Sequence, residues 1–163
     1  MTDFGASEEA ARTATLDDLD DLVNLAQAAI EEKRTQKGGG VWARRERRGD
    51  PLDISLRAAI GAPDQEVAVG LIDDTVVGYA AVRIELLADG GQLGVIDDLF
   101  VDPGCRAVGV GEMLMNHLID WCRQRGCFGV DSLALPGDRH TKNFFESFGL
   151  VARAIVVHRS LEA

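Results

Sequence analysis

Apolar residues in the first part of the chain recur with the spacing of amphipathic helices. Residues 12–15 favour a short strand, and a helix is predicted over about 16–32, where apolar positions follow three- and four-residue steps. These positions are Leu19, Leu22, Val23, Ala26 and Ile30. Residues 36–51 are rich in glycine and arginine and are expected to form a flexible loop, after which a short helix is predicted over about 52–60.

Three strands joined by tight turns are predicted in the middle of the chain. They cover residues 66–72, 76–86 and 93–101, which are apolar and bounded by turn residues. The turns are Asp73-Asp74-Thr75 and Asp89-Gly90-Gly91. Because short hairpins connect them, these three strands must run antiparallel.

The last third of the chain alternates between predicted helices and strands. Helices are expected at 111–125 and 141–148, and strands at 130–135 and 150–159. The helix between the strands at 93–101 and 130–135 makes these two strands parallel. The chain has 163 residues, which suggests a single α/β domain with a mixed, mostly antiparallel sheet.

The most informative segment lies where the strand at 93–101 leads into the helix at 111–125. It reads Arg106-Ala-Val-Gly-Val-Gly111. The start of a helix presents backbone N–H groups without helical partners, at the positive end of the helix dipole, and glycine allows an anion to approach closely. Arg106 could add a bidentate contact to phosphate oxygens. The alternative is a glycine-rich turn that only begins a helix.

Two common phosphate motifs do not fit this segment. The dinucleotide fingerprint requires a third glycine where Leu114 stands, and a P-loop requires Lys followed by Ser or Thr where Glu112 and Met113 stand.

Composition excludes several classes of function. The net charge of −10 disfavours nucleic-acid binding, and no apolar run reaches the roughly 20 residues of a membrane-spanning helix. The first residues do not resemble a signal peptide. Three scattered cysteines suggest neither a disulfide framework nor a metal site. The expected location is therefore the cytoplasm, with no membrane and no metal.

The chain resembles the GNAT superfamily of N-acetyltransferases. Val101-Asp102-Pro103, then Arg106-x-x-Gly109-x-Gly111 and an amphipathic helix, resemble the acetyl-CoA signature of that family. Residues 142–150, Lys-Asn-Phe-Phe-Glu-Ser-Phe-Gly-Leu, resemble its closing motif. Together the two motifs cover about residues 95–150 in the expected order. The resemblance implies helices on both faces of the sheet, and a parallel strand pair that splays apart at the cofactor site.

The resemblance also implies how acetyl-CoA is held. The backbone N–H groups of the loop would bind the pyrophosphate with help from Arg106, and the backbone of Leu99 and Val101 would pair with the pantetheine amides. The loop residues are Ala107, Val108, Gly109, Val110 and Gly111. Lys142 is either a ligand of a CoA phosphate or an exposed lysine on a surface helix.

Asp97 and Asp98 are the candidates for the general base. Successive side chains on a strand point to opposite faces, so one of the two is expected to face the acceptor cleft. We favour Asp97, because bases in the resembled family often share its alternating face. The alternative is that both carboxylates cap nearby backbone or pair with an arginine.

The sequence departs from the resembled family at the proton donor for the leaving thiolate. Many members of the resembled family carry a tyrosine where this chain has Phe145, which cannot donate a proton. His140, just before the same helix, is a candidate because histidine titrates near neutral pH, and the alternative is that it is an ordinary loop residue, as such a histidine more often is.

The acceptor site is expected at the first two helices and the loop between them. An aromatic and basic group in this loop would suit an acceptor with a carboxylate or phosphate. Its members are Trp42, Arg44, Arg45, Arg47 and Arg48. The expected function is transfer of an acetyl group from acetyl-CoA to a primary amine of a small molecule or peptide. The alternative is a catalytically weak or inactive acyl-CoA-binding sensor, and a homodimer is left open.

Overall fold

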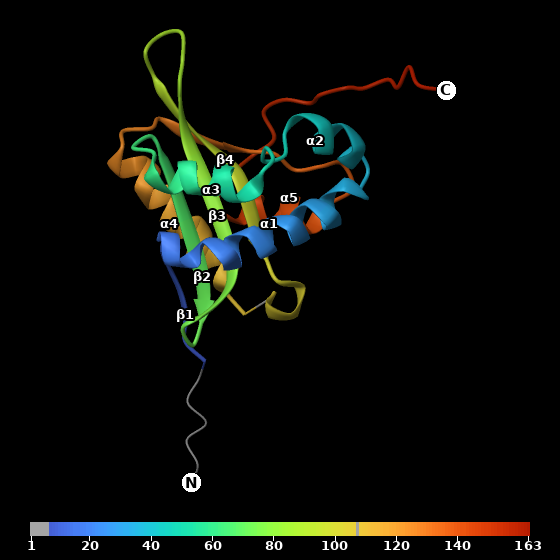
Figure 1. The fold of residues 1–163 in the computed structure, drawn as a ribbon. Coiled ribbons are helices and arrows are strands. Elements are labelled where there is room, and N and C mark those ends of the chain that lie inside the picture. The colour runs from blue at the N-terminus through green and yellow to red at the C-terminus, as the bar shows by residue number, and fades with distance from the viewer. Residues whose placement is uncertain (1–6, 107) are drawn as a thin grey trace.

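A five-stranded mixed sheet forms the centre of the protein, for which a computed structural model describes residues 7–106 and 108–163 (Figure 1). The strands are β1 (Glu9–Thr13), β2 (Gln65–Ile72), β3 (Thr75–Leu86), β4 (Gln92–Val101) and β5 (Gly129–Ser132). They lie side by side in sequence order. The first four are antiparallel and β5 runs parallel to β4, which confirms both the predicted hairpins and the predicted parallel pair.

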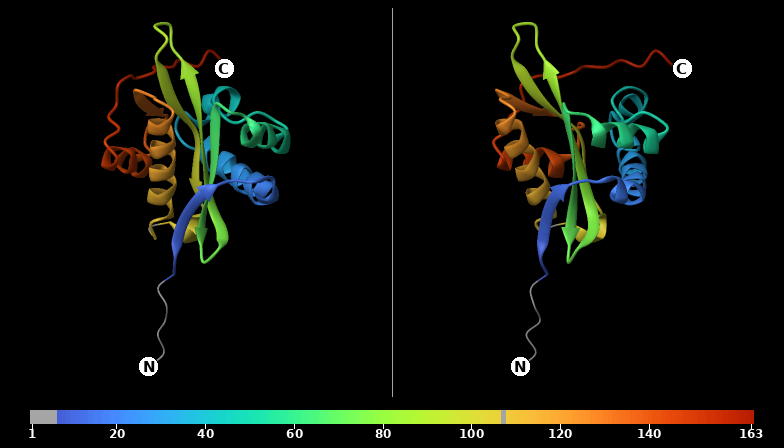
Figure 2. Two further views of the ribbon diagram at one scale, coloured as in Figure 1. Left: turned by 90° about the vertical axis from the view of Figure 1, so that its left-hand side faces the viewer. Right: turned by 60° about the vertical axis from the view of Figure 1, so that its left-hand side comes forward.

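Helices cover both faces of this sheet (Figure 2). The helices are α1 (Leu19–Arg34), α2 (Gly39–Arg45), α3 (Leu52–Gly61), α4 (Val110–Gln124) and α5 (Arg139–Ser147), with short 3₁₀ turns η1 (Leu16–Asp18) and η2 (Pro103–Cys105). On one face lie α1 and α3, with α2 beside α1, and on the other lie α4 and α5. The predicted single α/β layout is therefore the one observed.

Two hydrophobic cores hold the layers together. On one face, Leu22 of α1 and Leu56 of α3 are fully buried against the sheet, and on the other Leu114 and Leu118 of α4 are fully buried. Each such side chain contributes about 1.5–3 kcal/mol relative to an exposed one. Successive residues of a strand point to opposite faces of the sheet. Because runs of consecutive residues in β2 and β3 are buried, both faces of the sheet are covered.

The predicted loop at 36–51 is wrong in part, because a short helix, α2, forms within it. Gly38 adopts the left-handed conformation with φ of 82°. This residue is the N-cap of α2 and separates α2 from α1. The aromatic ring of Trp42 is buried in the new helix, and burial of that ring outweighs the low helix propensity of the neighbouring glycines.

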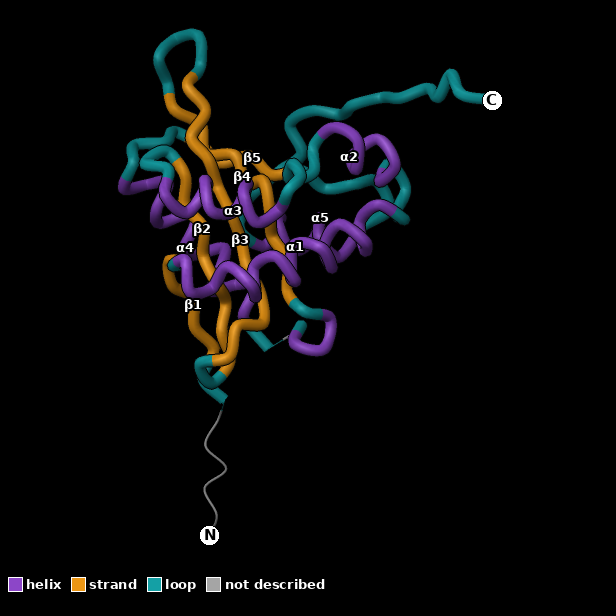
Figure 3. Tube along the Cα trace, viewed as in Figure 1, coloured by secondary structure: helices purple, strands orange, loops and turns teal. Residues whose placement is uncertain are grey.

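The predicted strand at 150–159 is also wrong, and β5 ends at Ser132 rather than at residue 135. Residues 150–163 form no regular element and extend away from the sheet (Figure 3). The valine and isoleucine content of this segment favours a strand, but a strand also requires a partner edge. No main-chain hydrogen bond joins residues 151–163 to the rest of the described chain.

The parallel strands β4 and β5 separate part way along their length. They pair only over Leu93–Ile96 and Gly129–Ser132, and beyond Ile96 strand β4 has β3 as its only described partner. This separation opens one edge of β4 next to the start of α4. Within the described residues, no helix has the length and apolar character needed to cross a membrane.

Candidate active site

The glycine-rich loop opens α4 as the sequence predicts. Gly109 has φ of 95° and is the cap of the helix, and a side chain at this position would be strained. The first bond of the helix runs from the Met113 N–H to the Gly109 carbonyl at 3.1 Å. The N–H groups of Val110, Gly111 and Glu112 therefore have no helical partner and are available to an anion.

The side chains of the loop fix it to the rest of the fold. Val110 is buried in the core under α4, whereas Val108 is exposed, and Ala107 lies outside the described residues. A Cβ atom added to Gly111 would lie 3.5 Å from the ring of Phe144 in α5. Val110 thus anchors the start of α4, whereas a Cβ atom added to Gly109 would have no atom within 4 Å.

Arg106 is bound by a carboxylate of α1 in this structure. Its Nη1 and Nη2 donate to the two carboxylate oxygens of Glu32 in α1 at 2.9 and 2.7 Å, and its Nε donates to the Val101 carbonyl at 2.9 Å. The hydrogen bond to Glu32 raises the pKa of Arg106. Arg106 therefore joins α1 to the end of β4, and the structure does not present it as a free phosphate ligand.

The open edge of β4 contains Leu99 and Val101, the residues predicted to bind an extended amide chain. Both side chains pack toward the α4 core. Their backbone groups lie along the part of the β4 edge where β5 no longer pairs. The Val101 carbonyl already accepts from Arg106. An extended ligand with amide groups can pair with such an edge as an additional strand would.

A β-bulge places Asp97 and Asp98 on the same face of the sheet, so the prediction of opposite faces is wrong. Ala81 pairs with Asp98 while Val82 pairs with Ile96, which leaves Asp97 as the extra residue. Ile96 and Leu99 both pack on the α4 side although they are three residues apart. The two aspartates between them face the α1 and α3 layer, because a bulge shifts the alternation by one residue.

Asp98 forms a buried ion pair with Arg48, from the segment between α2 and α3. Arg48 Nε donates to Asp98 Oδ2 at 2.7 Å, its Nη2 donates to the same oxygen, and its Nη1 donates to Ser55 Oγ at 3.1 Å. The two side chains are only 8% and 9% exposed. The alternative in which this carboxylate pairs with an arginine is thus the one observed.

Tyr79 of β3 is buried on the same face, where it neighbours Asp98. Burial and the nearby charge of Asp98 raise the pKa of its phenol well above the ordinary value. The phenol therefore stays protonated near neutral pH. Sequence reasoning set this tyrosine aside because it lies on a different strand, but the β3–β4 hairpin brings the two strands together.

Asp97 has a different environment from its neighbour. Its side chain is 34% exposed, and Arg83 Nε donates to its Oδ1 at 3.2 Å. Burial raises the pKa of Asp97 above the ordinary value, although the Arg83 charge opposes this effect. Asp97 is therefore a stronger base than an ordinary aspartate and remains accessible to solvent.

Lys33, near the end of α1, is a candidate site residue that sequence reasoning missed. Its Nζ lies 4.9 Å from the centre of the Trp42 ring, with the charges of Asp98 and Asp138 nearby. Burial lowers the pKa of Lys33, and no ion pair to it occurs in the described part of the chain. The signal was present, because Lys33 continues the apolar stripe three residues after Ile30.

The basic loop predicted for the acceptor is largely neutralised by its own surroundings. Arg44 pairs with Glu162 at 3.0 Å, Arg45 lies 3.7 Å from Glu46, and Arg47 pairs with Asp50. Trp42 is buried beneath this segment rather than displayed by it. Among the described residues, Lys33 is thus a half-buried cation on this side of the site that makes no ion pair, whereas the arginines of the loop are paired.

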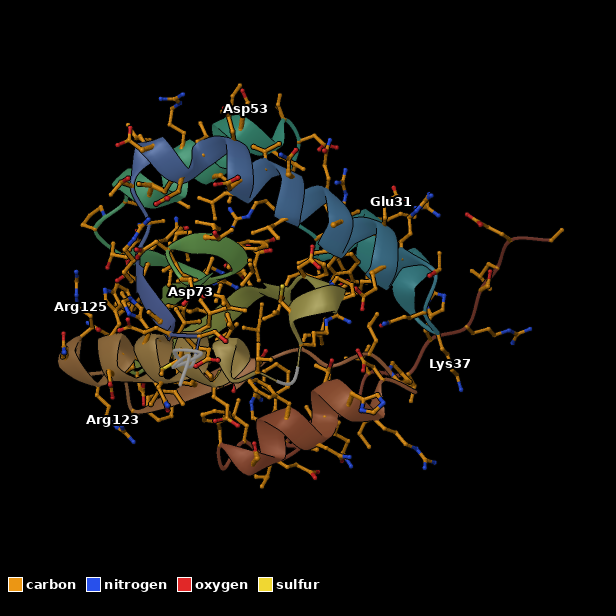
Figure 4. The ribbon with its side chains drawn as sticks, turned by 90° about the horizontal axis from the view of Figure 1, so that it is seen from below. Glu31, Lys37, Asp53, Asp73, Arg123 and Arg125 are labelled. Atoms are coloured by element: carbon orange, nitrogen blue, oxygen red, sulfur yellow. The ribbon has the colours of Figure 1, made fainter. Side chains whose placement is uncertain are left out.

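His140 and Lys142, the two site residues predicted near α5, make no described contact with Asp97 or Asp98. His140 is exposed and lines a groove with Gln36 and Lys37, and no described hydrogen bond or ion pair joins it to Asp97 or Asp98. Figure 4 shows Lys37 at the end of α1. Lys142 is exposed and pairs with Glu146 at 3.3 Å, as a surface lysine does.

Phe145 is buried, with 6% exposure, in the core under α4. Its ring makes an edge contact with Phe144, with 5.9 Å between ring centres. This position therefore supplies packing and no proton. No group of three or more His, Cys, Asp and Glu side chains in residues 7–106 and 108–163 is arranged to hold a metal ion.

Comparison with known proteins gives a consistent result. The model of the Acetyltransferase (GNAT) family matches residues 24–150, which is most of the chain. The chain is 32% identical over 79 residues to the glucosamine 6-phosphate N-acetyltransferase of Trypanosoma brucei brucei, covering 47% of this chain and 52% of that enzyme. It is 42% identical over 60 residues to the streptothricin acetyltransferase of Streptomyces lavendulae, covering 37% and 30%.

The chain therefore spans about half the length, or less, of these curated relatives in the regions that match. Among solved structures, the glucosamine-6-phosphate N-acetyltransferase of Arabidopsis thaliana superposes with a TM-score of 0.69 at 20% identity, covering 95% of this chain and 99% of that one. A likeness at this identity concerns the fold alone.

Proposed function

Because the chain belongs to the GNAT acetyltransferase family, we propose that it transfers an acetyl group from acetyl-CoA to a primary amine of a small molecule or peptide. The observation that supports this most is the open edge of β4 beside the free N–H groups at the start of α4. One feature suits an extended amide chain and the other suits a pyrophosphate, and the two are adjacent.

The residues around this edge fit acetyl-CoA. No atom lies within 4 Å of a Cβ built on Gly109, so a phosphate could reach the backbone there. The N–H groups of Val110 and Gly111 would hold the pyrophosphate, and the backbone of Leu99 would pair with the pantetheine arm. Acetyl-CoA would supply the activated acetyl group as a thioester. Arg106 would contribute to phosphate binding only after leaving Glu32.

Asp97 is the residue we propose as general base. A raised pKa makes a carboxylate better at taking a proton from the acceptor amine, directly or through a water, and Asp97 is accessible at the point where β4 and β5 separate. Asp98 is a weaker candidate because Arg48 neutralises its charge. Asp98 and Arg48 would position the bulge instead.

We propose that Lys33 and the groove lined by Lys37, Asp138 and His140 receive the acceptor, because the charge of Asp138 in that groove also acts on Lys33. A half-buried ammonium group without an ion-pair partner among the described residues favours an acceptor with an anionic group or several hydroxyls. The names of the two curated relatives refer to acetylation of glucosamine 6-phosphate and of streptothricin, and they suggest amino sugars and related amines as the first acceptors to test. His140 remains a candidate proton donor in this groove.

A second candidate function is binding of an acyl-CoA without turnover. The observation in its favour is that Phe145 is buried in an apolar cluster where many related enzymes have a proton-donating tyrosine. A thiolate leaves without a proton donor more easily than most groups, so we rank this candidate second.

Thiol release from acetyl-CoA over a panel of amino sugars, amino-sugar phosphates, aminoglycosides, amino acids and peptides tests the first proposal. A thermal shift with acetyl-CoA is measured in parallel, and a ligand at 100 times its Kd should add about 2.7 kcal/mol. Binding with no turnover on any amine would favour the second candidate, and no binding would contradict both.

A matched pair of variants controls this experiment. Gly109→Val and Gly126→Val both place a side chain at a positive φ in open space, but only Gly109 lies in the loop that begins α4. Gly126 follows the other end of that helix, which Figure 4 marks by Arg123 and Arg125. We expect only Gly109→Val to abolish the thermal shift caused by acetyl-CoA.

A further inference from the structure

The C-terminal part of α1 contacts both of the strands that separate at the candidate active site. On one side, Glu32 binds Arg106, whose Nε donates to the Val101 carbonyl at the end of β4 at 2.9 Å. On the other side, Gly38 packs on the segment that follows β5, because a Cβ atom built on it would lie 3.4 Å from Pro136 Cδ. The stretch between these two contacts therefore lies beside the gap where β4 and β5 no longer pair.

Lys33 belongs to this stretch, and its surroundings come from both sides of the gap. The charges of Asp98 on β4 and of Asp138 in the segment after β5 both act on its amine. The Lys33 Nζ lies 4.9 Å from the centre of the Trp42 ring, and within residues 7–106 and 108–163 it makes no ion pair. This amine is therefore held close to the edge of β4 at Leu99, where the pantetheine arm is proposed to bind.

Lys33 is also a better nucleophile than an ordinary lysine. Burial lowers the pKa of its ammonium group, although the charges of the nearby carboxylates oppose this effect. A lower pKa leaves a larger fraction of the side chain as the neutral amine near neutral pH, and the neutral amine is the form that attacks a carbonyl carbon. Lys37 and Lys142, the other two lysines of the chain, are exposed.

We propose that Lys33 is acetylated by the acetyl-CoA bound to its own chain, which makes this lysine a site of self-modification. The proposal rests on the proposed function, because it requires the thioester to lie at the gap between β4 and β5. The neutral Lys33 Nζ attacks the carbonyl carbon of the thioester, and a C–N bond forms while the C–S bond breaks. CoA leaves as the thiolate, and the nitrogen releases one proton to water.

Acetylation changes the charge of the site. It removes the positive charge of Lys33 and, with it, the cation–π contact to the Trp42 ring. An acceptor with an anionic group then loses the charge that is proposed to bind it. A chain that meets acetyl-CoA in the absence of an acceptor is therefore expected to shift its preference toward uncharged acceptors.

Peptide mass mapping of the full chain after incubation with acetyl-CoA, without an acceptor, tests the proposal. Lys37 and Lys142 are internal controls, because both are exposed to acetyl-CoA in solution. We expect Lys33 to be acetylated at least about tenfold faster than either, because a thioester held beside an amine has a far higher effective concentration than one in solution. Equal rates at the three lysines, or no acetyl group on Lys33, would overturn the proposal.

The thermal shift caused by acetyl-CoA separates a failure of this proposal from a failure of the proposed function. We expect Gly109→Val to lose both the shift and the fast acetylation of Lys33, and Gly126→Val to keep both. A shift in the unchanged chain without acetylation of Lys33 would reject self-modification and leave cofactor binding in place. No shift, together with no thiol release on any amine, would reject the proposed function and self-modification with it.

Dilution of the protein shows whether the acetyl group comes from the same copy of the chain. For transfer within one copy, the fraction of Lys33 acetylated per unit time should stay constant when the protein is diluted at a fixed concentration of acetyl-CoA. A rate that falls with dilution would show transfer between copies and overturn the proposal.

Two conservative variants identify the fast site by intact mass. Lys33→Arg keeps the positive charge but removes the amine, and Lys37→Arg makes the same change four residues later, at the exposed end of α1. We expect Lys33→Arg to take up no acetyl group in the time in which the unchanged chain and Lys37→Arg each take up one. Uptake by Lys33→Arg equal to that of the unchanged chain would place the fast site elsewhere and overturn the proposal.

Discussion

Arg48 and Asp98 form a buried ion pair across 50 residues of sequence, with 2.7 Å between Arg48 Nε and Asp98 Oδ2. The pair fixes the segment between α2 and α3 to the bulge of β4. It therefore connects the side of the protein expected to bind the acceptor with the strand expected to bind acetyl-CoA. Because both charges are buried, neither can be removed without leaving the other unpaired.

Breaking this pair should destabilise the protein strongly. We expect Arg48→Met to lower the free energy of unfolding by about 3–5 kcal/mol, because it leaves the Asp98 charge buried and alone. Chemical denaturation of this variant measures the loss. The double variant Arg48→Met with Asp98→Asn should recover part of it, and a double variant as unstable as the sum of the single ones would show that the pair is not coupled.

Asp97→Asn should lower kcat by about 10²–10⁴-fold while leaving the Kd for acetyl-CoA nearly unchanged, as loss of a general base does. The melting temperature should not fall near neutral pH. A raised pKa means that ionised Asp97 costs stability above that pKa, and the neutral amide removes this cost. Asp98→Asn is the comparison, and equal kinetic effects of both variants at matched stability would reject Asp97 as the base.

The acid side of the pH profile should report Asp97. A base is active when deprotonated, so kcat/KM should fall as the pH drops through a pKa that lies above the ordinary aspartate value. Arg83 opposes the upward shift, so Arg83→Met should move this limb to higher pH, whereas Arg83→Lys should leave it nearly in place. An acid limb that does not respond to Arg83→Met would assign the limb to another group.

Glu32→Gln should strengthen binding of acetyl-CoA. In the described structure Glu32 holds both terminal nitrogens of Arg106, so a phosphate has to compete for the guanidinium. A partly exposed pair of this kind is worth about 0.2–1 kcal/mol, so the Kd should fall by a factor of about 1.4 to 5. Titration calorimetry measures the change, and Glu31→Gln, one position earlier on α1, is the matched control. Weaker binding in Glu32→Gln would mean that the pair organises the site.

Phe145→Tyr should be neutral or harmful to turnover. The side chain is buried among apolar neighbours, and a hydroxyl without a partner there costs about 1–3 kcal/mol. Thermal unfolding and steady-state kinetics on the same preparation separate loss of stability from loss of activity. A large rise in kcat would instead show that protonation of the thiolate limits the reaction.

Apart from α2 and the missing strand at 150–159, the order of the elements could be predicted from the sequence, and so could the helix that begins at the glycine loop. Hydrophobic periodicity and turn residues are local properties of the sequence. The spacing of Leu114 and Leu118 therefore predicts a helix, and Asp89-Gly90-Gly91 predicts a turn, without knowledge of the rest of the chain. The parallel pairing of β4 and β5 could be predicted from the helix between them, because a helical crossover returns the chain to the end of the sheet where the first strand began.

The tertiary structure alone decided how the charges are used. Arg106 meets Glu32 from 74 residues away and Arg48 meets Asp98 from 50, and no local pattern encodes such contacts. The bulge at Asp97 depends on the register between β3 and β4, so the facing of both aspartates could not be read from alternation. Residues 150–159 have the composition of a strand, but composition does not decide whether a segment pairs with an open edge such as that of β5, and in the described structure this segment does not pair.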